Sequence, residues 1–293
     1  MKKINPVKKV AAIHDLSGFG RASLTAIIPV LSTMGVQVCP VPTAVLSTHT
    51  GGFENFTLVD LTDSMSDYIN HWKEIKLSFD CIYSGFLAST RQIEIVSETI
   101  DIFSNEDNFV VVDPVMGDDG TLYQTMDDEM VDSMRKLIKK ADIITPNFTE
   151  ACYLLNEDYT FDISEEEIKL WLKRLSKIGP EIVILTSVPN IEKSKKTSVI
   201  AYNRENDVFW KVSCTYIPAF YPGTGDAFTS VVIGSILQGD SLPISLERGV
   251  QFITNGIKAS YGFDYPKREG ILLERVLDTL KLPVITSSYE MMK

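Results

Sequence analysis

Cysteine, histidine and cationic residues are all scarce in this chain of 293 residues. The cysteines are Cys39, Cys81, Cys152 and Cys214, and they form neither a CxxC pair nor a cluster with any of the three histidines. This spacing excludes a disulfide-stapled scaffold and the common zinc-binding motifs. It favours buried free thiols in a reducing compartment.

Acidic residues outnumber basic ones: the chain has 28 Lys and Arg residues and 39 Asp and Glu residues, which gives a formal net charge of −11. Such a chain has little long-range attraction for nucleic acid or for an anionic membrane surface, so we expect neither as a partner. A phosphate group would have to be held locally, by backbone N–H groups, metal ions or a few placed cations.

Long apolar runs are also missing. No run approaches the roughly 18 residues of a membrane span, and the opening Met-Lys-Lys is not followed by the apolar stretch of a signal peptide. We therefore expect a cytoplasmic protein. With 44% hydrophobic residues the chain can bury a sizeable core, and it contains no repeat, linker or low-complexity tract, so we expect one domain over residues 1–293.

Short apolar runs alternate with segments of helical period along most of the chain. The expected strands are Lys9–His14, Val36–Val45, Phe79–Tyr83, Phe109–Val112, Asp142–Thr145 and Ile182–Thr186. The expected helices are Ala22–Met34, Ser64–Ile75, Arg91–Phe103, Asp127–Lys140, Thr149–Asn156 and Glu165–Ile178. This alternation predicts an α/β fold with a mostly parallel central sheet covered on both faces.

The pattern changes after residue 196. Two runs, Thr197–Asn203 and Val208–Ser213, are separated by four polar residues and predict an antiparallel hairpin at one edge of the sheet. Three helices are expected after it, over Gly225–Gln238, Leu246–Ser260 and Leu272–Leu280.

The most informative motif is Gly223-Thr-Gly-Asp226, which stands directly before a predicted helix. The glycines allow a tight turn and a close backbone approach, and the helix start offers free N–H groups to an anion. An acidic side chain there would repel a phosphate, so Asp226 is better explained as a base that takes a proton from an attacking hydroxyl. An ordinary Asp N-cap remains the alternative.

Two further polar segments follow predicted strands, where ligands bind in open α/β sheets. In Asp113-Pro-Val-Met-Gly-Asp118 the carboxylates suggest a divalent cation, with Mg²⁺ favoured when it also bridges phosphates. The Asp119-Gly120 pair beside them is typical of a solvated turn. In Thr145-Pro-Asn-Phe-Thr-Glu150, Asn147 and Glu150 could face one ligand, although the same spacing makes a plain capping box.

Together these motifs, in this order and spacing, resemble the ribokinase-like superfamily, and within it the pyridoxal kinases. Two further segments support the resemblance: Ser47-Thr-His-Thr50 is similar to the family's Ser-Asn-His-Thr, and Thr186-Ser187 ends a strand where the family places nucleotide contacts. The resemblance extends from Val10 to about Leu280. It implies a three-layer α/β/α sandwich that phosphorylates the 5′-hydroxymethyl group of pyridoxal, pyridoxine or pyridoxamine with ATP.

The resemblance also implies roles for the motif residues. Asp226 corresponds to the catalytic base, and the backbone of Gly223, Thr224 and Gly225 corresponds to the anion hole. Mg²⁺ would be organised by Asp113, Asp118 and Glu150. The ATP phosphates would lie along Asp113, Thr145, Asn147, Thr186 and Ser187. A response to K⁺ and a homodimer are further expectations of the family.

The acceptor pocket is expected to lie against the N-terminal segments. Its candidate residues are Asp15, Ser17, His49, Thr50, Phe86 and Tyr123. Asp15 departs from the better-known pyridoxal kinases, which have Ser at the strand exit, and it could pair with a protonated pyridine nitrogen. His49 could instead be an ordinary hydrogen-bonded loop residue, and Phe86 could belong to the core.

Two other functions remain open. A kinase of hydroxymethylpyrimidine or of a sugar would share the fold, because a fold does not fix a substrate. The aromatic residues Tyr83 and Phe86 favour a flat ring over a sugar. A non-catalytic sensor of a vitamin or nucleotide would keep the pocket, but it would have no use for the intact Gly223-Thr-Gly-Asp226 motif.

Overall fold

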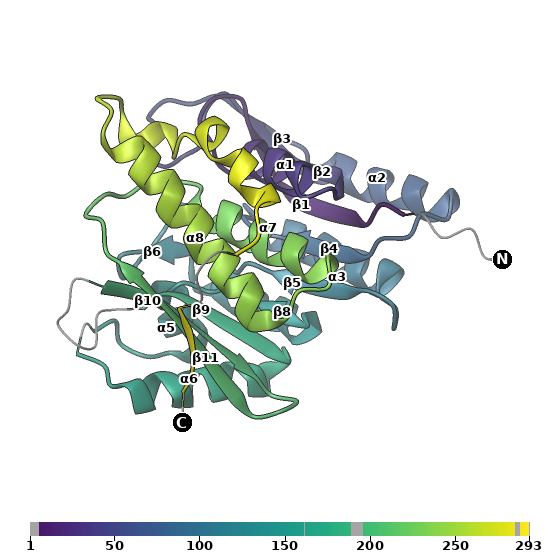
Figure 1. The fold of residues 1–293 in the computed structure, drawn as a ribbon. Coiled ribbons are helices and arrows are strands. Elements are labelled where there is room, and N and C mark those ends of the chain that lie inside the picture. Colours follow the sequence, from purple (N-terminus) through teal and green to yellow (C-terminus); the bar gives the residue numbers. More distant parts are fainter. Residues whose placement is uncertain (1–5, 161, 189–195, 285–287, 293) are drawn as a thin grey trace.

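The computed structural model describes residues 6–160, 162–188, 196–284 and 288–292. These residues form a twisted, mostly parallel sheet between two layers of helices, which confirms the predicted three-layer α/β/α fold (Figure 1). The strand order is β12-β11-β10-β9-β8-β5-β4-β1-β2-β3. The bounds are β1 Lys9–Ser17, β2 Gln37–Leu46, β3 Leu58–Asp60, β4 Cys81–Ser84, β5 Phe109–Val112, β8 Ile143–Ile144, β9 Ile182–Val188, β10 Lys196–Asn203, β11 Val208–Thr215 and β12 Tyr289–Met292.

The centre of the sheet, from β2 through β1, β4, β5 and β8 to β9, is parallel, and the strands at both edges are antiparallel. Alternate residues of β1 lie on opposite faces of the sheet, as the two-residue period of a strand requires. Val10 and Ala12 belong to one apolar cluster, whereas Ala11 and Ile13 belong to another on the opposite face. This double burial is why the central strands are apolar throughout.

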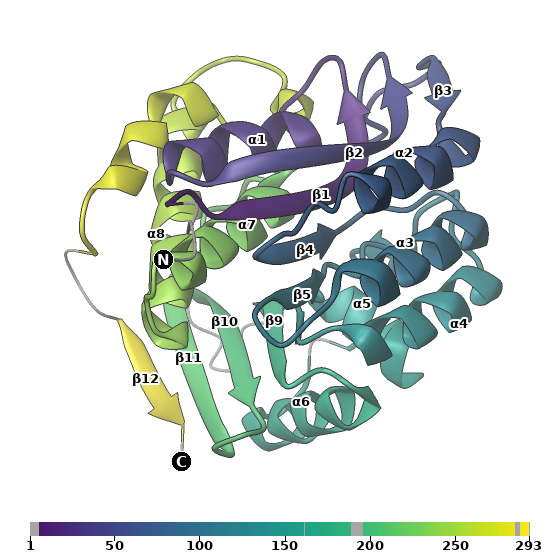
Figure 2. The same cartoon turned by 90° about the vertical axis from the view of Figure 1, so that its right-hand side faces the viewer.

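Each face of the sheet has its own helices (Figure 2). One face carries α1 Leu24–Thr33, α7 Thr224–Leu237 and α8 Leu242–Tyr261. The other face carries α2 Thr62–Glu74, α3 Thr90–Phe103, α4 Asp128–Leu137, α5 Phe148–Leu155 and α6 Glu165–Ile178. A 3₁₀ turn, η1 Ile138–Lys140, extends α4. Among the described residues, no helix is long and apolar enough to cross a membrane.

The prediction of a helix over Leu272–Leu280 was wrong. This segment forms two separate 3₁₀ turns, η3 Leu273–Arg275 and η4 Leu277–Lys281, after an earlier turn, η2 Lys267–Glu269. Val276, with φ of −128°, interrupts them. Leu273, Val276 and Leu280 are nevertheless buried against α1 and α8, so the apolar spacing was satisfied by 3₁₀ turns in place of an α-helix.

Other differences concern the edges of the sheet. The predicted hairpin forms as β10 and β11, but β12 pairs beyond it, so the hairpin is not the outermost element. The short edge strand β3 and a separate hairpin of β6 Gly117–Asp118 and β7 Thr121–Leu122 were not predicted. The β6–β7 hairpin follows β5 and carries Asp118 at the carboxyl end of the sheet.

Candidate active site

The carboxyl ends of the central strands and the start of α7 surround a cavity of about 1060 Å³. Every residue predicted from the sequence for the site lines this cavity, with the exception of Ser17. They are Asp15, His49, Thr50, Phe86, Asp113, Asp118, Tyr123, Thr145, Asn147, Glu150, Thr186, Ser187, Gly223, Thr224, Gly225 and Asp226. The cavity is at the upper end of the size range for ligand sites, and it has room for more than one small molecule.

Gly223 ends the loop before α7 and makes the sharp entry into the helix possible. Its φ of 79° lies in the left-handed region, and a Cβ at this position would overlap the carbonyl oxygen of Arg21. At Gly225, by contrast, a Cβ would meet only Asp113 Oδ2, at 4.0 Å. The first turn of α7 therefore presents its backbone N–H groups to the cavity without a capping side chain, which suits an anion.

Asp226 lies in that first turn, with its side chain mostly buried. Its Oδ2 accepts a hydrogen bond from the backbone N–H of Ser23 at 2.7 Å, and its Oδ1 lies 3.9 Å from Nδ1 of His14. The pKa of Asp226 is raised to about 7, mainly by burial; the Ser23 hydrogen bond lowers it and the nearby Asp15 raises it. Such a carboxylate can accept a proton near neutral pH.

Ser23 was not predicted as a site residue, although it connects Asp226 with Asp15. Its hydroxyl donates to Asp15 Oδ1 at 2.5 Å, while Ser17 donates to Asp15 Oδ2 at 3.0 Å. Ser17 is thus a buried support of Asp15 and does not face the cavity. Desolvation raises the pKa of Asp15, and the two hydroxyls oppose that shift. The predicted helix Ala22–Met34 included Ser23, whereas α1 begins at Leu24 and Ser23 precedes it, a position where Ser is common.

Three further carboxylates, those of Asp113, Asp118 and Glu150, line the same cavity. Burial, together with the charge of Asp226, raises the pKa of Asp113 to about 8. Burial also raises the pKa values of Glu150 and Asp118, and Asp113 adds to the effect at Glu150. Asp226 therefore repels Asp113, and Asp113 and Asp118 repel Glu150, so a bound cation would relieve this repulsion.

Glu150 also completes the capping box that was the alternative interpretation. Its Oε2 accepts from Asn147 N at 2.7 Å, its Oε1 accepts from Met116 N at 3.1 Å, and its own N–H donates to Asn147 Oδ1 at 2.9 Å. Among the described residues, no group of three or more His, Cys, Asp or Glu side chains is arranged to hold a metal ion. The carboxylates fit a Mg²⁺ ion that keeps some waters and shares its coordination with a phosphate-bearing ligand.

The other residues predicted for the phosphates lie at the ends of β8 and β9 and at the start of α5. Thr145, after β8, accepts at its hydroxyl from Thr229 of α7 at 3.1 Å. Asn147 donates its amide to Gly117 O at 2.9 Å and forms an isolated bridge with Thr186. Ser187 has a φ of 55° and is exposed. Through these contacts the ends of β8 and β9 and the start of α5 form one wall of the cavity.

His49 was predicted to donate to the acceptor ring, but both of its ring nitrogens contact backbone. Its Nε2 lies 2.7 Å from the carbonyl oxygen of Arg268, and its Nδ1 accepts from Gly51 N at 3.1 Å. Burial lowers the pKa of His49, so the ring is neutral, donates through Nε2 and joins two loops. Thr50, Phe86 and Tyr123 remain free to contact a ligand in the cavity.

Comparison with known proteins shows the family of this chain. The family model of phosphomethylpyrimidine kinase matches residues 18–270. The chain belongs to that family. A Bacteroides thetaiotaomicron protein provisionally assigned as a phosphomethylpyrimidine kinase, and crystallised with pyridoxal, is 56% identical over 98% of this chain and 100% of its own, with a TM-score of 0.94.

More distant relatives include pyridoxal kinases. The Arabidopsis thaliana pyridoxal kinase is 26% identical over 92% of this chain and 81% of its own length. The pyridoxal kinase of Leishmania donovani, solved with ADP and pyridoxamine, is 20% identical over 97% of this chain and 99% of its own, with a TM-score of 0.83. The chain therefore has the ribokinase-like fold of the pyridoxal kinases, as the motifs predicted.

Proposed function

We propose that this family member is an ATP-dependent kinase of B6 vitamers, which transfers a phosphoryl group to the 5′-hydroxymethyl group of pyridoxal, pyridoxine or pyridoxamine. The observation that carries the proposal is the position of Asp226 in the first turn of α7, beside the free N–H groups that follow Gly223. The 56% identical protein that holds pyridoxal, and the related kinase that holds ADP, support the two ligand classes.

In the proposed reaction the acceptor hydroxyl attacks the γ-phosphorus of ATP. The new O–P bond forms, the bond from the γ-phosphorus to the bridging oxygen breaks, and ADP leaves with that electron pair. Asp226 takes the hydroxyl proton. The N–H groups of residues 224–226 stabilise the charge that spreads over the transferred group.

The acidic wall would hold Mg²⁺ through Asp118 and Asp113, while Glu150 stabilises the loop that carries them. When bound with ATP, the ion would offset phosphate charge. Thr145, Asn147, Thr186 and Ser187 would contact the phosphates from the strand ends.

Asp15 would recognise the acceptor ring, with Thr50, Phe86 and Tyr123 around it. Held by two hydroxyls, its carboxylate is fixed in direction, as an ion pair with a protonated pyridine nitrogen requires. Hydroxymethylpyrimidine is the second candidate acceptor, because the matching family model is that of phosphomethylpyrimidine kinase.

The test is a coupled assay of ADP release with Mg²⁺ and ATP across pyridoxal, pyridoxine, pyridoxamine, hydroxymethylpyrimidine and ribose. We expect the highest kcat/KM with a B6 vitamer and background release with ribose. A hydroxymethylpyrimidine value that exceeds all three vitamers would replace the proposal by its alternative. ADP release that no acceptor stimulates would contradict both. Light scattering and a KCl titration of the same preparation test the expected homodimer and the expected response to K⁺.

A further inference from the structure

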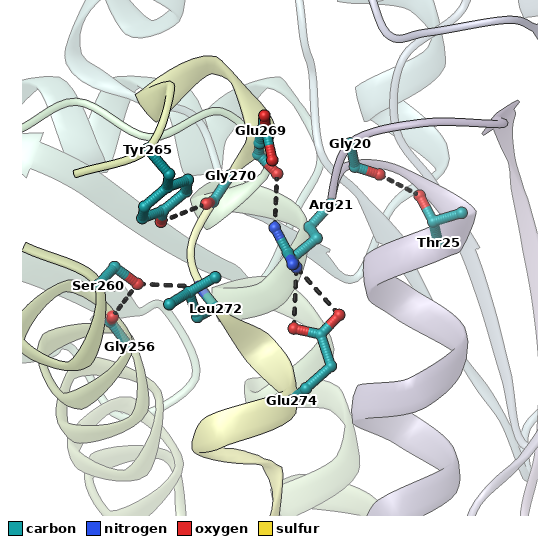
Figure 3. A network of polar contacts seen from close by, with 10 residues as sticks. All are labelled: Gly20, Arg21, Thr25, Gly256, Ser260, Tyr265, Glu269, Gly270, Leu272 and Glu274. Atoms are coloured by element: carbon teal, nitrogen blue, oxygen red, sulfur yellow. Dashed lines mark hydrogen bonds and ion pairs between the residues drawn. The ribbon is translucent and has the colours of Figure 1, made fainter. Parts of the chain in front are cut away.

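The loop before α1 is joined to the C-terminal part of the chain through Arg21 (Figure 3). Its Nε donates to both carboxylate oxygens of Glu274, at 3.0 and 2.9 Å. The carbonyl oxygen of Glu269 accepts from Arg21 twice, from Nη1 at 3.2 Å and from the backbone N–H at 3.1 Å. Arg21 is thus fixed at both its side chain and its backbone by residues about 250 positions away.

The segment that carries the two partners of Arg21 is joined to α8 through Leu272, as Figure 3 also shows. Tyr265 donates its hydroxyl to Gly270 O at 2.8 Å. Leu272 N donates to the hydroxyl of Ser260, which in turn donates to Gly256 O within α8. Because α8 packs against α7, the helix that carries Asp226, this segment connects Arg21 with the helix of Asp226.

The backbone of Arg21 is enclosed between two glycine turns. A Cβ at Gly223 would overlap its carbonyl oxygen, and a Cβ at Gly270 would come within 3.0 Å of the same oxygen. Two residues later, Ser23 has φ of 50° and ψ of −136°. A non-glycine residue keeps such a conformation only where its surroundings impose it. In this conformation the Ser23 N–H reaches Asp226 Oδ2 at 2.7 Å.

Arg21 is absent from the residues that line the cavity, and its side chain is 25% exposed. Its side-chain contacts are with Glu274 and Glu269, and an ion pair whose carboxylate partner is 66% exposed adds little to stability. We propose that Arg21 is a positioning residue, which holds residues 21–23 so that the Ser23 N–H fixes the Asp226 carboxylate for proton abstraction. This inference rests on the proposed kinase function and extends its machinery beyond the cavity wall.

The proposal has a pH signature. The groups that face Asp226 are His14 and Asp15 of β1, Tyr83 of β4, Asp113 after β5, and Tyr123. Since Arg21 is not among them, its direct charge effect is small, and it acts through the Ser23 N–H, which lowers the pKa of Asp226. Loosening that hydrogen bond would raise the pKa, so the acidic limb of kcat/KM would move to higher pH.

The experiment compares Arg21→Ala with Arg21→Lys, Glu274→Gln and a control, Arg91→Ala. Arg91 is matched because it also forms an exposed ion pair, with Glu94 of its own helix. For Arg21→Ala we expect kcat to fall about 10- to 100-fold, KM for ATP and pyridoxal to stay within about threefold, and the acidic limb to shift up by about one pH unit. The kcat and the pH profile of Arg21→Lys and Glu274→Gln should lie between those of Arg21→Ala and the parent. Those of Arg91→Ala should match the parent.

A double variant separates positioning from general damage. If Arg21 acts through Asp226, adding Arg21→Ala to Asp226→Asn should lower the remaining rate by no more than about threefold. We expect the melting temperature of Arg21→Ala to fall by no more than about 3 °C, as for an exposed ion pair in a chain of this size. An unshifted pH limb, or a full loss in the Asp226→Asn background, would overturn the inference.

The two proposals fail differently. If the parent protein releases ADP with none of the acceptors, the kinase function itself is wrong. If the parent is active and Arg21→Ala retains its kcat and pH profile, only the role of Arg21 is wrong.

Discussion

Nδ1 of His14 lies 3.9 Å from Oδ1 of Asp226, and the two groups do not form an ion pair. The His14 ring is fully buried and packs edge-on against Tyr83 at 4.3 Å between ring centroids. Burial lowers the pKa of His14 to about 3, so the ring is neutral at any working pH. Asp226 therefore has a neutral neighbour where a cation would make it a weaker base, and its pKa stays near 7.

The first prediction follows from this pKa. Asp226 must be ionised to take a proton, so kcat/KM should fall about tenfold for each pH unit below about 7 and level off above it. Rates at saturating ATP from pH 5.5 to 9 test this. Pyridoxine and pyridoxamine should be measured beside pyridoxal, so that titration of the acceptor is separated from titration of the enzyme. Full activity at pH 5.5 with all three would contradict the assignment of Asp226.

Asp226→Asn should remove the base and keep the size of the side chain. We expect kcat to fall by about two to four decades, the usual contribution of general base catalysis, while ATP affinity is largely retained. Asp63→Asn is a matched control, because Asp63 is an exposed carboxylate in the first turn of α2. If Asp226→Asn turns over like this control, Asp226 is only a helix-start residue.

The sequence was sufficient for the layers of the fold but not for its edges. Central strands such as Phe109–Val112 are buried on both faces, so their composition alone distinguishes them. Strand β3 has Leu58 and Val59 exposed, and β12 follows a long separation from its partner β11, so neither carries such a pattern. At Leu272–Leu280 the spacing of leucines suits an α-helix and a 3₁₀ turn equally, and packing against α1 and α8 decided the outcome.

The site shows the same division. Motif residues that follow strands were predicted to meet, because parallel strands end at one edge of the sheet, and they line one cavity. The direction of each side chain was not predictable. Ser17 faces Asp15, His49 is bound by two loops, and the unusual φ of Ser23 depends on contacts with residues 200 or more positions away. No local sequence pattern predicts contacts between residues so far apart in the chain.

The two glycines of the α7 loop should respond differently to alanine. Gly223→Ala would place a side chain in the left-handed region and against Arg21 O, so we expect a destabilisation of about 1–3 kcal/mol or more together with a loss of activity. Gly225→Ala has room and lies in a helix, where Ala is favoured by about 0.5–1 kcal/mol. It should melt no lower than the parent, yet its methyl group would enter the proposed phosphate site and lower kcat. Thermal melts and steady-state rates of both variants distinguish these effects. If Gly223→Ala melts at the same temperature as Gly225→Ala, Gly223 is not required for the sharp entry into α7.

Asp118→Asn tests the metal wall. Glu150 is a poor choice for this purpose, because each of its oxygens accepts a backbone N–H and an amide has only one acceptor oxygen. Among the described residues, the carboxylate of Asp118 accepts only from Asp119 N, at 3.0 Å, so its replacement should leave the melting temperature close to that of the parent. We expect the Mg²⁺ concentration for half-maximal rate to rise about tenfold or more. Asp119→Asn is the control, since Asp119 is exposed and its φ of 47° suits Asn. If the Mg²⁺ titration of Asp118→Asn superimposes on that of the parent, Asp118 does not bind the metal ion.

Asp15→Ser would introduce the residue type of the better-known pyridoxal kinases at the position where this chain departs from them. If the carboxylate binds a protonated ring nitrogen, its loss should weaken acceptor binding by about 1–3 kcal/mol, the range for hydrogen bonds to charged groups, and leave the KM for ATP unchanged. The structure adds a complication, because Ser17 and Ser23 both donate to Asp15 and would lose their acceptor. Asp15→Asn keeps one acceptor oxygen and the shape of the side chain, so it serves as the matched variant. A rise in acceptor KM with both variants supports recognition of the ring, whereas a lower melting temperature with both Michaelis constants unchanged would mean that Asp15 only holds the loop and Ser23 in place.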